Sequence, residues 1–302
     1  MTDLSTSFIG IQMKNPLVTA SGTCGYGHEM SELFDLSLLG GISIKGITPT
    51  PRLGNPPPRI AETACGMLNS VGLQNPGVDY VIEKELPFLA KFDTAVIANI
   101  AGHSFDDYRI MAEKLDNAAG VAALEVNISC PNVSAGGMTF GVDPKSAHKI
   151  ISLVKDVTKL PVIAKLSPNV TDITEIAKAC EDAGADGLSL INTLLGMVID
   201  AEKRKPVLAN RTGGLSGPAI KPVALHMVWK TAQAVKIPIM GMGGISTGLD
   251  AVEFLMAGAT AFQIGSINFH DPMAAPRIIR ELNEWCDAHN IKKASELIGT
   301  LE

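Results

Sequence analysis

The chain contains 302 residues, of which 46% are hydrophobic and 19% are charged, and its net charge is −6. This composition argues against a disordered chain, and the negative charge argues against a nucleic-acid partner. No apolar run reaches the roughly 18 residues of a membrane span, and residues 1–8 lack the basic and apolar regions of a secretion signal. We therefore expect neither a membrane segment nor a secretion signal.

The cysteines and histidines form no disulfide or metal-binding pattern. Five cysteines stand far apart, at positions 24, 65, 130, 180 and 286, and the six histidines are scattered. An odd, dispersed set without a C-x-x-C pair disfavours a disulfide framework, an iron–sulfur cluster and zinc. We expect a reducing, cytoplasmic setting and no bound metal. Cys24 and Cys65 are expected to serve in packing, with the mouth of a site or a partner's face as the alternative.

Eight short apolar runs alternate with helical patterns. Strands are predicted at residues 17–20, 41–45, 94–99, 122–128, 161–166, 187–191, 237–241 and 261–264. Helices are predicted at residues 78–91, 104–117, 144–158, 171–183, 219–235, 247–257 and 272–289. Apolar strands joined by helical crossovers are typical of a closed parallel barrel. We predict an α/β fold, a TIM (β/α)8 barrel, as one domain over residues 1–302. An open doubly wound sheet is the alternative.

Two segments interrupt this alternation. Residues 48–75 are rich in proline and glycine and contain two short extended pieces, which predicts an excursion over one mouth of the barrel. Residues 194–217 contain a charged run at 202–205 and a glycine-rich run at 213–217. The charged run is predicted to be solvated surface.

A cysteine follows the fourth predicted strand, between two asparagines. Pro131 ends that strand, because proline lacks the N–H that a strand ladder needs. Cys130 is therefore a candidate acid/base or nucleophile, with amide side chains beside it that can hold a polar planar ligand. The alternative is a small buried hydrophobe, which is how most free cysteines behave.

Polar side chains and glycine turns end most of the predicted strands. Because the chemistry of such barrels occurs at the carboxyl ends of the strands, these residues are predicted to share one rim. The set comprises Lys45, Lys165, Asn99, Asn127, Asn192 and glycine turns at 241–244 and 265–266. Each lysine is alternatively a snorkelling surface residue. The two turns follow the last two strands, a common place for a phosphate. A phosphate held without metal, beside lysines and a flat ligand, suggests flavin mononucleotide (FMN).

Several segments resemble the dihydroorotate dehydrogenases. They are residues 15–22, 43–48, 69–75, 127–132, 163–168, 192–193 and 242–245, and the similarity covers nearly the whole chain. The resemblance implies an FMN-binding barrel that oxidises (S)-dihydroorotate to orotate in pyrimidine biosynthesis. Cys130 would remove the C5 proton while a hydride passes from C6 to the flavin. The small residues at 134–137, which follow Cys130, predict a lid that closes over the substrate and excludes water.

The same resemblance implies two sets of binding residues. For the substrate they are Lys45, Asn69, Ser70, Val71, Gly72, Leu73, Asn127, Asn192 and Thr193. For FMN they are Ser21, Lys45, Gly46, Asn99, Asn127, Lys165, Ile191, Gly217, Gly243, Gly244, Gly265 and Ser266. Lys165 would face the pyrimidine edge of the flavin, where reduction leaves negative charge. Asn132 would touch substrate or, alternatively, stabilise a turn.

The stretches at 66–69 and 72–77 are most similar to the branch of the family that uses NAD. That branch implies a homodimeric core in a heterotetramer with an electron-transfer subunit containing FAD and a 2Fe–2S cluster. The membrane-associated branch resembles this chain less, because its members use serine as the base. The alternatives are a fumarate-dependent member, another FMN barrel acting on dihydropyrimidines, and a lysine Schiff-base lyase.

Overall fold

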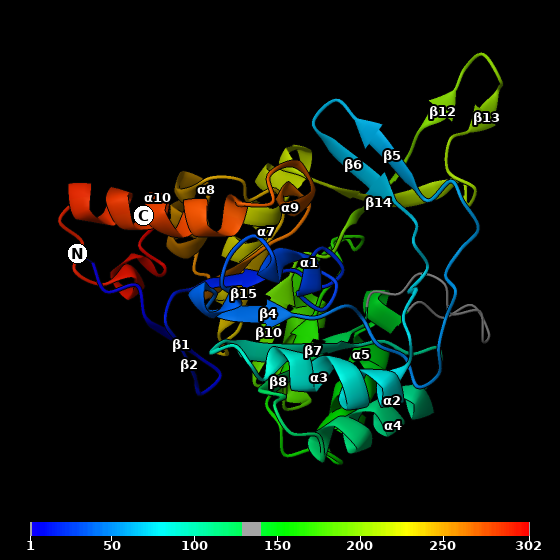
Figure 1. Cartoon of the computed structure of the whole chain (residues 1–302), viewed down its shortest axis with the longest axis horizontal. Helices are drawn as coiled ribbons and strands as arrows, with labels where there is room; N and C mark the ends of the chain where they lie inside the picture. The colour runs from blue at the N-terminus through cyan, green and yellow to red at the C-terminus, as the bar shows by residue number, and fades with distance from the viewer. Residues whose placement is uncertain (1, 129–139, 302) are drawn as a thin grey trace.

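Eight parallel strands close into a barrel (Figure 1). The computed structural model describes residues 2–128 and 140–301. In their order around the barrel the strands are β3 (Leu17–Thr19), β4 (Gly41–Ser43), β7 (Ala95–Ile100), β8 (Ala123–Asn127), β9 (Val162–Lys165), β10 (Gly187–Leu190), β15 (Ile239–Met242) and β16 (Ala261–Ile264). The ring closes where β16 pairs with β3. The predicted barrel and its eight strands are therefore confirmed, and the open sheet is wrong.

Helices follow the strands as predicted and pack side by side around the barrel. They are α4 (Phe105–Asp116), α5 (Pro144–Lys155), α6 (Ile173–Asp182), α7 (Lys221–Ala234), α8 (Gly248–Met256) and α10 (Ala274–Ala288). Ser104, Asp143, Asp172 and Thr247 each cap a helix by accepting a hydrogen bond from a backbone N–H of the first turn. These caps explain why the predicted starts of the four capped helices fall within two residues of the observed ones.

The predicted helix at 78–91 is helical from residue 78 to residue 89, but it is not α-helical throughout. It consists of α2 (Val78–Tyr80), a π-helical stretch η2 (Val81–Glu85) and α3 (Leu86–Leu89). Pro87 has no N–H to donate to the carbonyl of Glu83 one α-turn earlier, and a wider local turn accommodates that loss.

A β-hairpin that the sequence did not predict closes the amino-terminal end of the barrel. It comprises β1 (Thr6–Phe8) and β2 (Ile11–Met13). Phe8 is fully buried and packs with Val18, Ile97 and Ile163 from three barrel strands. The hairpin thus leaves the carboxyl ends of the strands as the end where a ligand site can form.

Short helical segments complete the chain. They are α1 (His28–Ser31), η1 (Leu36–Leu38), η3 (Phe140–Val142), η4 (Pro218–Ile220), α9 (Ile267–His270) and η5 (Ala294–Leu297). Among the described helices, none is both long and apolar enough to cross a membrane.

The two predicted insertions form one antiparallel sheet. Its order is β11 (Leu194–Met197), β14 (Thr212–Ser216), β6 (Gly66–Asn69) and β5 (Ile60–Thr63). The sheet lies to one side of the barrel in Figure 1, and the hairpin of β12 (Ile199–Asp200) and β13 (Lys205–Pro206) projects farthest from it. Residues 202–205 are exposed, as predicted. The pairing of β6 with β14 was not predicted.

Candidate active site

The strand ends bring the predicted amides and one predicted lysine together at one rim. Asn127 on β8 stands in register with Lys165 on β9, and Lys165 in turn stands in register with Ser189 on β10. Asn192, just past β10, donates a hydrogen bond from Nδ2 to Asn127 Oδ1 at 3.3 Å. Residues predicted from three separate strands therefore form one continuous polar surface.

Lys45, the other predicted lysine, lies two residues beyond β4 and packs over a glycine. A Cβ added to Gly22 would stand 3.3 Å from Lys45 Nζ. Burial lowers the pKa of Lys45 from its usual value, because desolvation disfavours the ammonium form. A partly desolvated lysine at a barrel rim is a feature of functional sites.

Asn99 presents an oxygen that needs a donor. The side chain is 1% exposed, and its Nδ2 donates to Glu125 Oε2 at 2.6 Å. Its Oδ1 is buried and has no hydrogen-bond partner within the described part of the chain. A Cβ on Gly46 would stand 2.9 Å from this oxygen. Since an unpaired buried carbonyl is costly, this place suits a ligand N–H.

The glycine turns line a pocket of about 290 Å³ at the carboxyl ends of β15 and β16. Gly217, Gly244 and Ser266 of the predicted cofactor set are in its wall, together with residues 62–66 of the insertion. Gly217 and Gly244 adopt φ of 102° and 74°. A Cβ on Gly244 would stand 2.8 Å from the Gly217 carbonyl oxygen. The backbone here is open to an approaching anion because these residues have no side chains.

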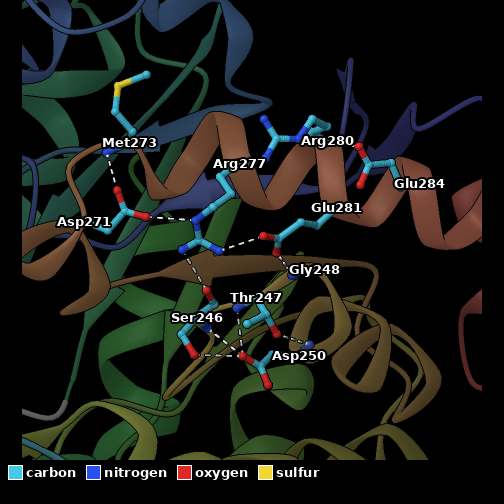
Figure 2. A network of polar contacts seen from close by, with 10 residues as sticks. All are labelled: Ser246, Thr247, Gly248, Asp250, Asp271, Met273, Arg277, Arg280, Glu281 and Glu284. Carbon is cyan, nitrogen blue, oxygen red and sulfur yellow. Dashed lines mark hydrogen bonds and ion pairs between the residues drawn. The ribbon is translucent and has the colours of Figure 1, made fainter.

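A polar network braces the loop behind this pocket (Figure 2). Arg277 on α10 donates to the Ser246 carbonyl at 3.1 Å and pairs with Asp271 and Glu281, each at 2.9 Å. Asp250 accepts from the backbone N–H of Ser246 at 2.8 Å. Hydrogen bonds to both the carbonyl and the N–H of Ser246 therefore hold the loop that carries Gly243 and Gly244.

The insertion sheet positions the predicted substrate residues. Asn69 on β6 donates to the Gly214 carbonyl at 3.5 Å. A Cβ on Gly214 would overlap the Thr193 hydroxyl, so Asn69 and Thr193 flank the same stretch of β14. Leu73, which has a positive φ of 56°, lies next to Gly46. A Cβ added to Gly46 would stand 3.7 Å from Leu73 Cδ2. The predicted substrate segment and the predicted cofactor segment are thus adjacent.

The other predicted residues occupy the same junctions. Ser21, Ile191, Gly243 and Gly265 directly follow or lie just beyond barrel strands, and Ser70, Val71 and Gly72 follow β6. Ser70 is buried and its hydroxyl has no partner among residues 2–128 and 140–301. Cys130, Asn132 and the predicted lid at 134–137 lie outside the described residues.

The two cysteines with open assignments differ. Cys24 is buried and contacts Thr19 Oγ1 at 3.1 Å, so packing is confirmed for it. Cys65 is exposed and lines the glycine pocket. The packing prediction is wrong for Cys65, because the hairpin of β5 and β6 presents its turn to the pocket rather than to the core.

The sequence interpretation missed a buried carboxylate. Glu125 lies within β8 and is fully buried, and it contacts Asn99 and Lys165 of the predicted cofactor set. Polar residues also stand inside three other apolar strands, namely Ser43, Ser189 and Gln263. That recurrence was a signal for a polar cluster within the barrel.

A barrel with lysines, amides and a glycine-lined pocket at one rim defines a ligand-binding enzyme fold, and the family model for dihydroorotate dehydrogenase matches residues 3–286. The chain belongs to the dihydroorotate dehydrogenase family. This confirms the resemblance and decides against the Schiff-base lyase.

Similar proteins carry a more specific name. The chain is 57% identical over 300 residues to "Dihydroorotate dehydrogenase B (NAD(+)), catalytic subunit" of Geobacter sp. (strain M21), covering 99% of this chain and 98% of that protein. It is 54% identical over 296 residues to the protein of that name from Bacillus pumilus (strain SAFR-032), covering 98% and 96% respectively.

Proposed function

We propose that this chain is the catalytic subunit of an NAD+-linked dihydroorotate dehydrogenase, which oxidises (S)-dihydroorotate to orotate in pyrimidine biosynthesis. The observation that carries the proposal is the identity of 57% over essentially the full length of a protein with that name. At such identity over nearly the whole of both chains, a different substrate would require different residues at the barrel rim. The rim residues of this chain suit the proposed ligands.

FMN is the proposed cofactor. The fit rests on the unpaired buried oxygen of Asn99 and on the pocket where Gly217 and Gly244 present backbone without side chains. Gly243, Gly244, Gly265 and Ser266 would hold the phosphate, while Ser21, Lys45, Gly46, Asn99, Asn127, Lys165 and Ile191 would surround the ring system. When bound, the flavin supplies the acceptor for the hydride from C6 of the substrate.

The chain's own residues would bind and orient the substrate. Asn69, Asn127, Asn192 and Thr193 offer donors and acceptors that suit an imide edge and a carboxylate, with Ser70, Val71, Gly72 and Leu73 closing over the ring. The Lys45 ammonium would offset developing negative charge. Cys130, assigned from its motif, would take the C5 proton as a thiolate.

A second subunit is proposed to carry the electrons onward. The name "catalytic subunit" in the relatives implies a partner in those proteins. For this chain we propose a homodimeric core in a heterotetramer with a subunit that contains FAD and a 2Fe–2S cluster, in the cytoplasm.

The purified chain should be yellow, and dihydroorotate should bleach its flavin band without oxygen. Cys130→Ala should keep the flavin and slow bleaching by at least about 100-fold, the scale of general-base catalysis. Cys180→Ala, at a buried cysteine on α6, is the matched control and should bleach at the wild-type rate. A colourless protein, or unchanged bleaching in Cys130→Ala, contradicts the proposed cofactor or the proposed base respectively.

The electron acceptor is tested on the same bleached protein. Fumarate should leave the flavin reduced, whereas NAD+ should restore the band only after the electron-transfer subunit is added. Rapid reoxidation by fumarate alone would place the chain in the fumarate-dependent branch.

A further inference from the structure

Glu125 is a fully buried carboxylate inside the barrel that the proposed mechanism does not use. It lies on β8, two residues before Asn127, and five side-chain donors from five other strands point at it. A buried charge is expensive unless it is paired and fully hydrogen-bonded. Its presence here therefore calls for a reason.

The two oxygens of Glu125 have different neighbours. Oε1 accepts from Ser189 Oγ and Gln263 Nε2, each at 2.8 Å. Oε2 accepts from Ser43 Oγ at 2.9 Å, Asn99 Nδ2 at 2.6 Å and Lys165 Nζ at 3.5 Å. An ionised carboxylate, which only accepts, suits five donors. Burial alone would raise the pKa of Glu125, but the Lys165 ammonium and the donors from Asn99, Ser189 and Gln263 outweigh it and hold the pKa below its usual value.

Two of the donors to Oε2 belong to the proposed cofactor site. Asn99 Nδ2 donates to Glu125, and this hydrogen bond fixes the orientation of the Asn99 amide. Asn99 Oδ1 therefore lies beside Gly46, in the proposed cofactor site. Lys165 is 5% exposed, and its positive charge is balanced by the carboxylate 3.5 Å away.

We propose that Glu125 is a positioning residue for the flavin: it orients the Asn99 amide and balances the Lys165 charge, and it thereby lowers the redox potential of the bound cofactor. The inference rests on the proposed function. A negative charge behind Lys165 disfavours the anionic reduced flavin, so the carboxylate moderates the stabilisation that the ammonium gives to that form.

Glu125→Gln removes the charge and keeps the shape. The new amide oxygen can still accept from Asn99 and Lys165. The new NH2 takes the place of Oε1, so the Gln263 amide, whose Nε2 now donates there, turns over and accepts through its Oε1, which is buried and has no partner within the described residues. The midpoint potential of the bound flavin, measured by anaerobic dye titration, should shift to a more positive value than in the wild type. An unchanged or more negative potential overturns the proposal.

Ser189→Ala is the matched control, because it removes one hydrogen bond to Oε1 and leaves the charge and the Oε2 contacts intact. It should lower the melting temperature without moving the potential. A shift in Ser189→Ala equal to that in Glu125→Gln would reveal a merely structural role and also overturns the proposal.

Glu125→Asp covers the case in which Glu125→Gln does not fold. The shorter carboxylate lies farther from Lys165 Nζ, so the potential should shift in the same direction by a smaller amount, and a wild-type potential contradicts the proposal. A wild-type protein that binds no flavin would instead defeat the proposed function. The two failures are therefore distinguishable.

Discussion

Thr193 and Gly214 pack so closely that no side chain fits between them: a Cβ on Gly214 would overlap the Thr193 hydroxyl. Thr193 follows the barrel strand β10, whereas Gly214 lies in the insertion strand β14. This contact joins the barrel rim to the insertion sheet at the point where Asn69 also meets β14. The separation between sheet and rim is thus set by the absence of a side chain at residue 214.

Gly214→Ala should weaken substrate binding and spare the cofactor. The added methyl group must push Thr193 or β14 away, and overpacking of this kind costs about 1–3 kcal/mol. We expect the KM for dihydroorotate to rise at least about tenfold, since about 1.4 kcal/mol corresponds to a factor of ten. Gly196→Ala is the control in the same sheet, because its Cβ would meet the end of the Leu68 side chain at 3.0 Å and Leu215 Cβ at 3.8 Å and would overlap neither. Equal KM values for both variants would contradict the predicted place of Thr193.

Arg277→Met should loosen FMN. Without the guanidinium, the Ser246 carbonyl loses its side-chain donor, and Asp271 and Glu281 lose their ion pairs with Arg277 (Figure 2). We expect the FMN dissociation constant, measured by fluorescence titration of the apoprotein, to rise about tenfold, the scale of one charge-assisted hydrogen bond. Arg280→Met on the same helix is the control, because Arg280 is exposed and forms an ion pair with the exposed Glu284 at 3.6 Å. Tight FMN binding in Arg277→Met would show that the loop holds its shape unaided.

Cys24 should make the fold less stable in alkali. Burial raises the pKa of its thiol from 9.0 to about 11, so above pH 9 the unfolded chain loses a proton that the folded chain keeps. By linkage this stability is complete below pH 9 and is lost as the pH rises towards 11, by about 1.4 kcal/mol per pH unit.

The measurement compares urea unfolding of the wild type and Cys24→Ala at pH 8 and pH 10. The wild type should lose roughly 1 kcal/mol more free energy of unfolding than the variant between the two values. Because both proteins share every other titrating group, parallel losses would mean that the Cys24 thiol titrates normally in the folded protein.

Phe8→Ala should destabilise the barrel from the end opposite the site. Phe8 is fully buried against Val18, Ile97 and Ile163, and removing such a ring costs about 3–5 kcal/mol. The flavin spectrum of the folded fraction should be unchanged. Leu33→Ala, at a residue that is 52% exposed, should change the unfolding free energy by less than about 0.5 kcal/mol. A spectral change in Phe8→Ala would indicate that the hairpin also supports the rim.

Local sequence signals were enough for the barrel and its rim. Lys165 and Asn127 end apolar runs, and in a parallel barrel all strands end on the same side. Their position next to each other could therefore be predicted once the barrel was predicted. Gly244 was predictable as a turn because it follows a strand and precedes a capped helix.

Glu125 was missed because it lies inside the run at 122–128 and not at its end, where Asn127 stands, and a polar residue within a strand does not reveal its partners. Its five donors come from other strands, whose inward positions are fixed only by the register of the closed barrel. The position of Cys65 in the pocket wall could not be predicted for a similar reason, because it depends on the pairing of β6 with β14, two segments that are far apart in the sequence.

The pairing of β6 with β14 has a consequence for biosynthesis of the chain. Asn69 and Gly214 are 145 residues apart, so the first hairpin leaves the ribosome long before its partner strand exists. During that interval the edge of β6 has no neighbour, and contacts of such long sequence separation form late because loop closure comes first. Nascent or truncated chains that stop before residue 212 would therefore display an unprotected edge on β6.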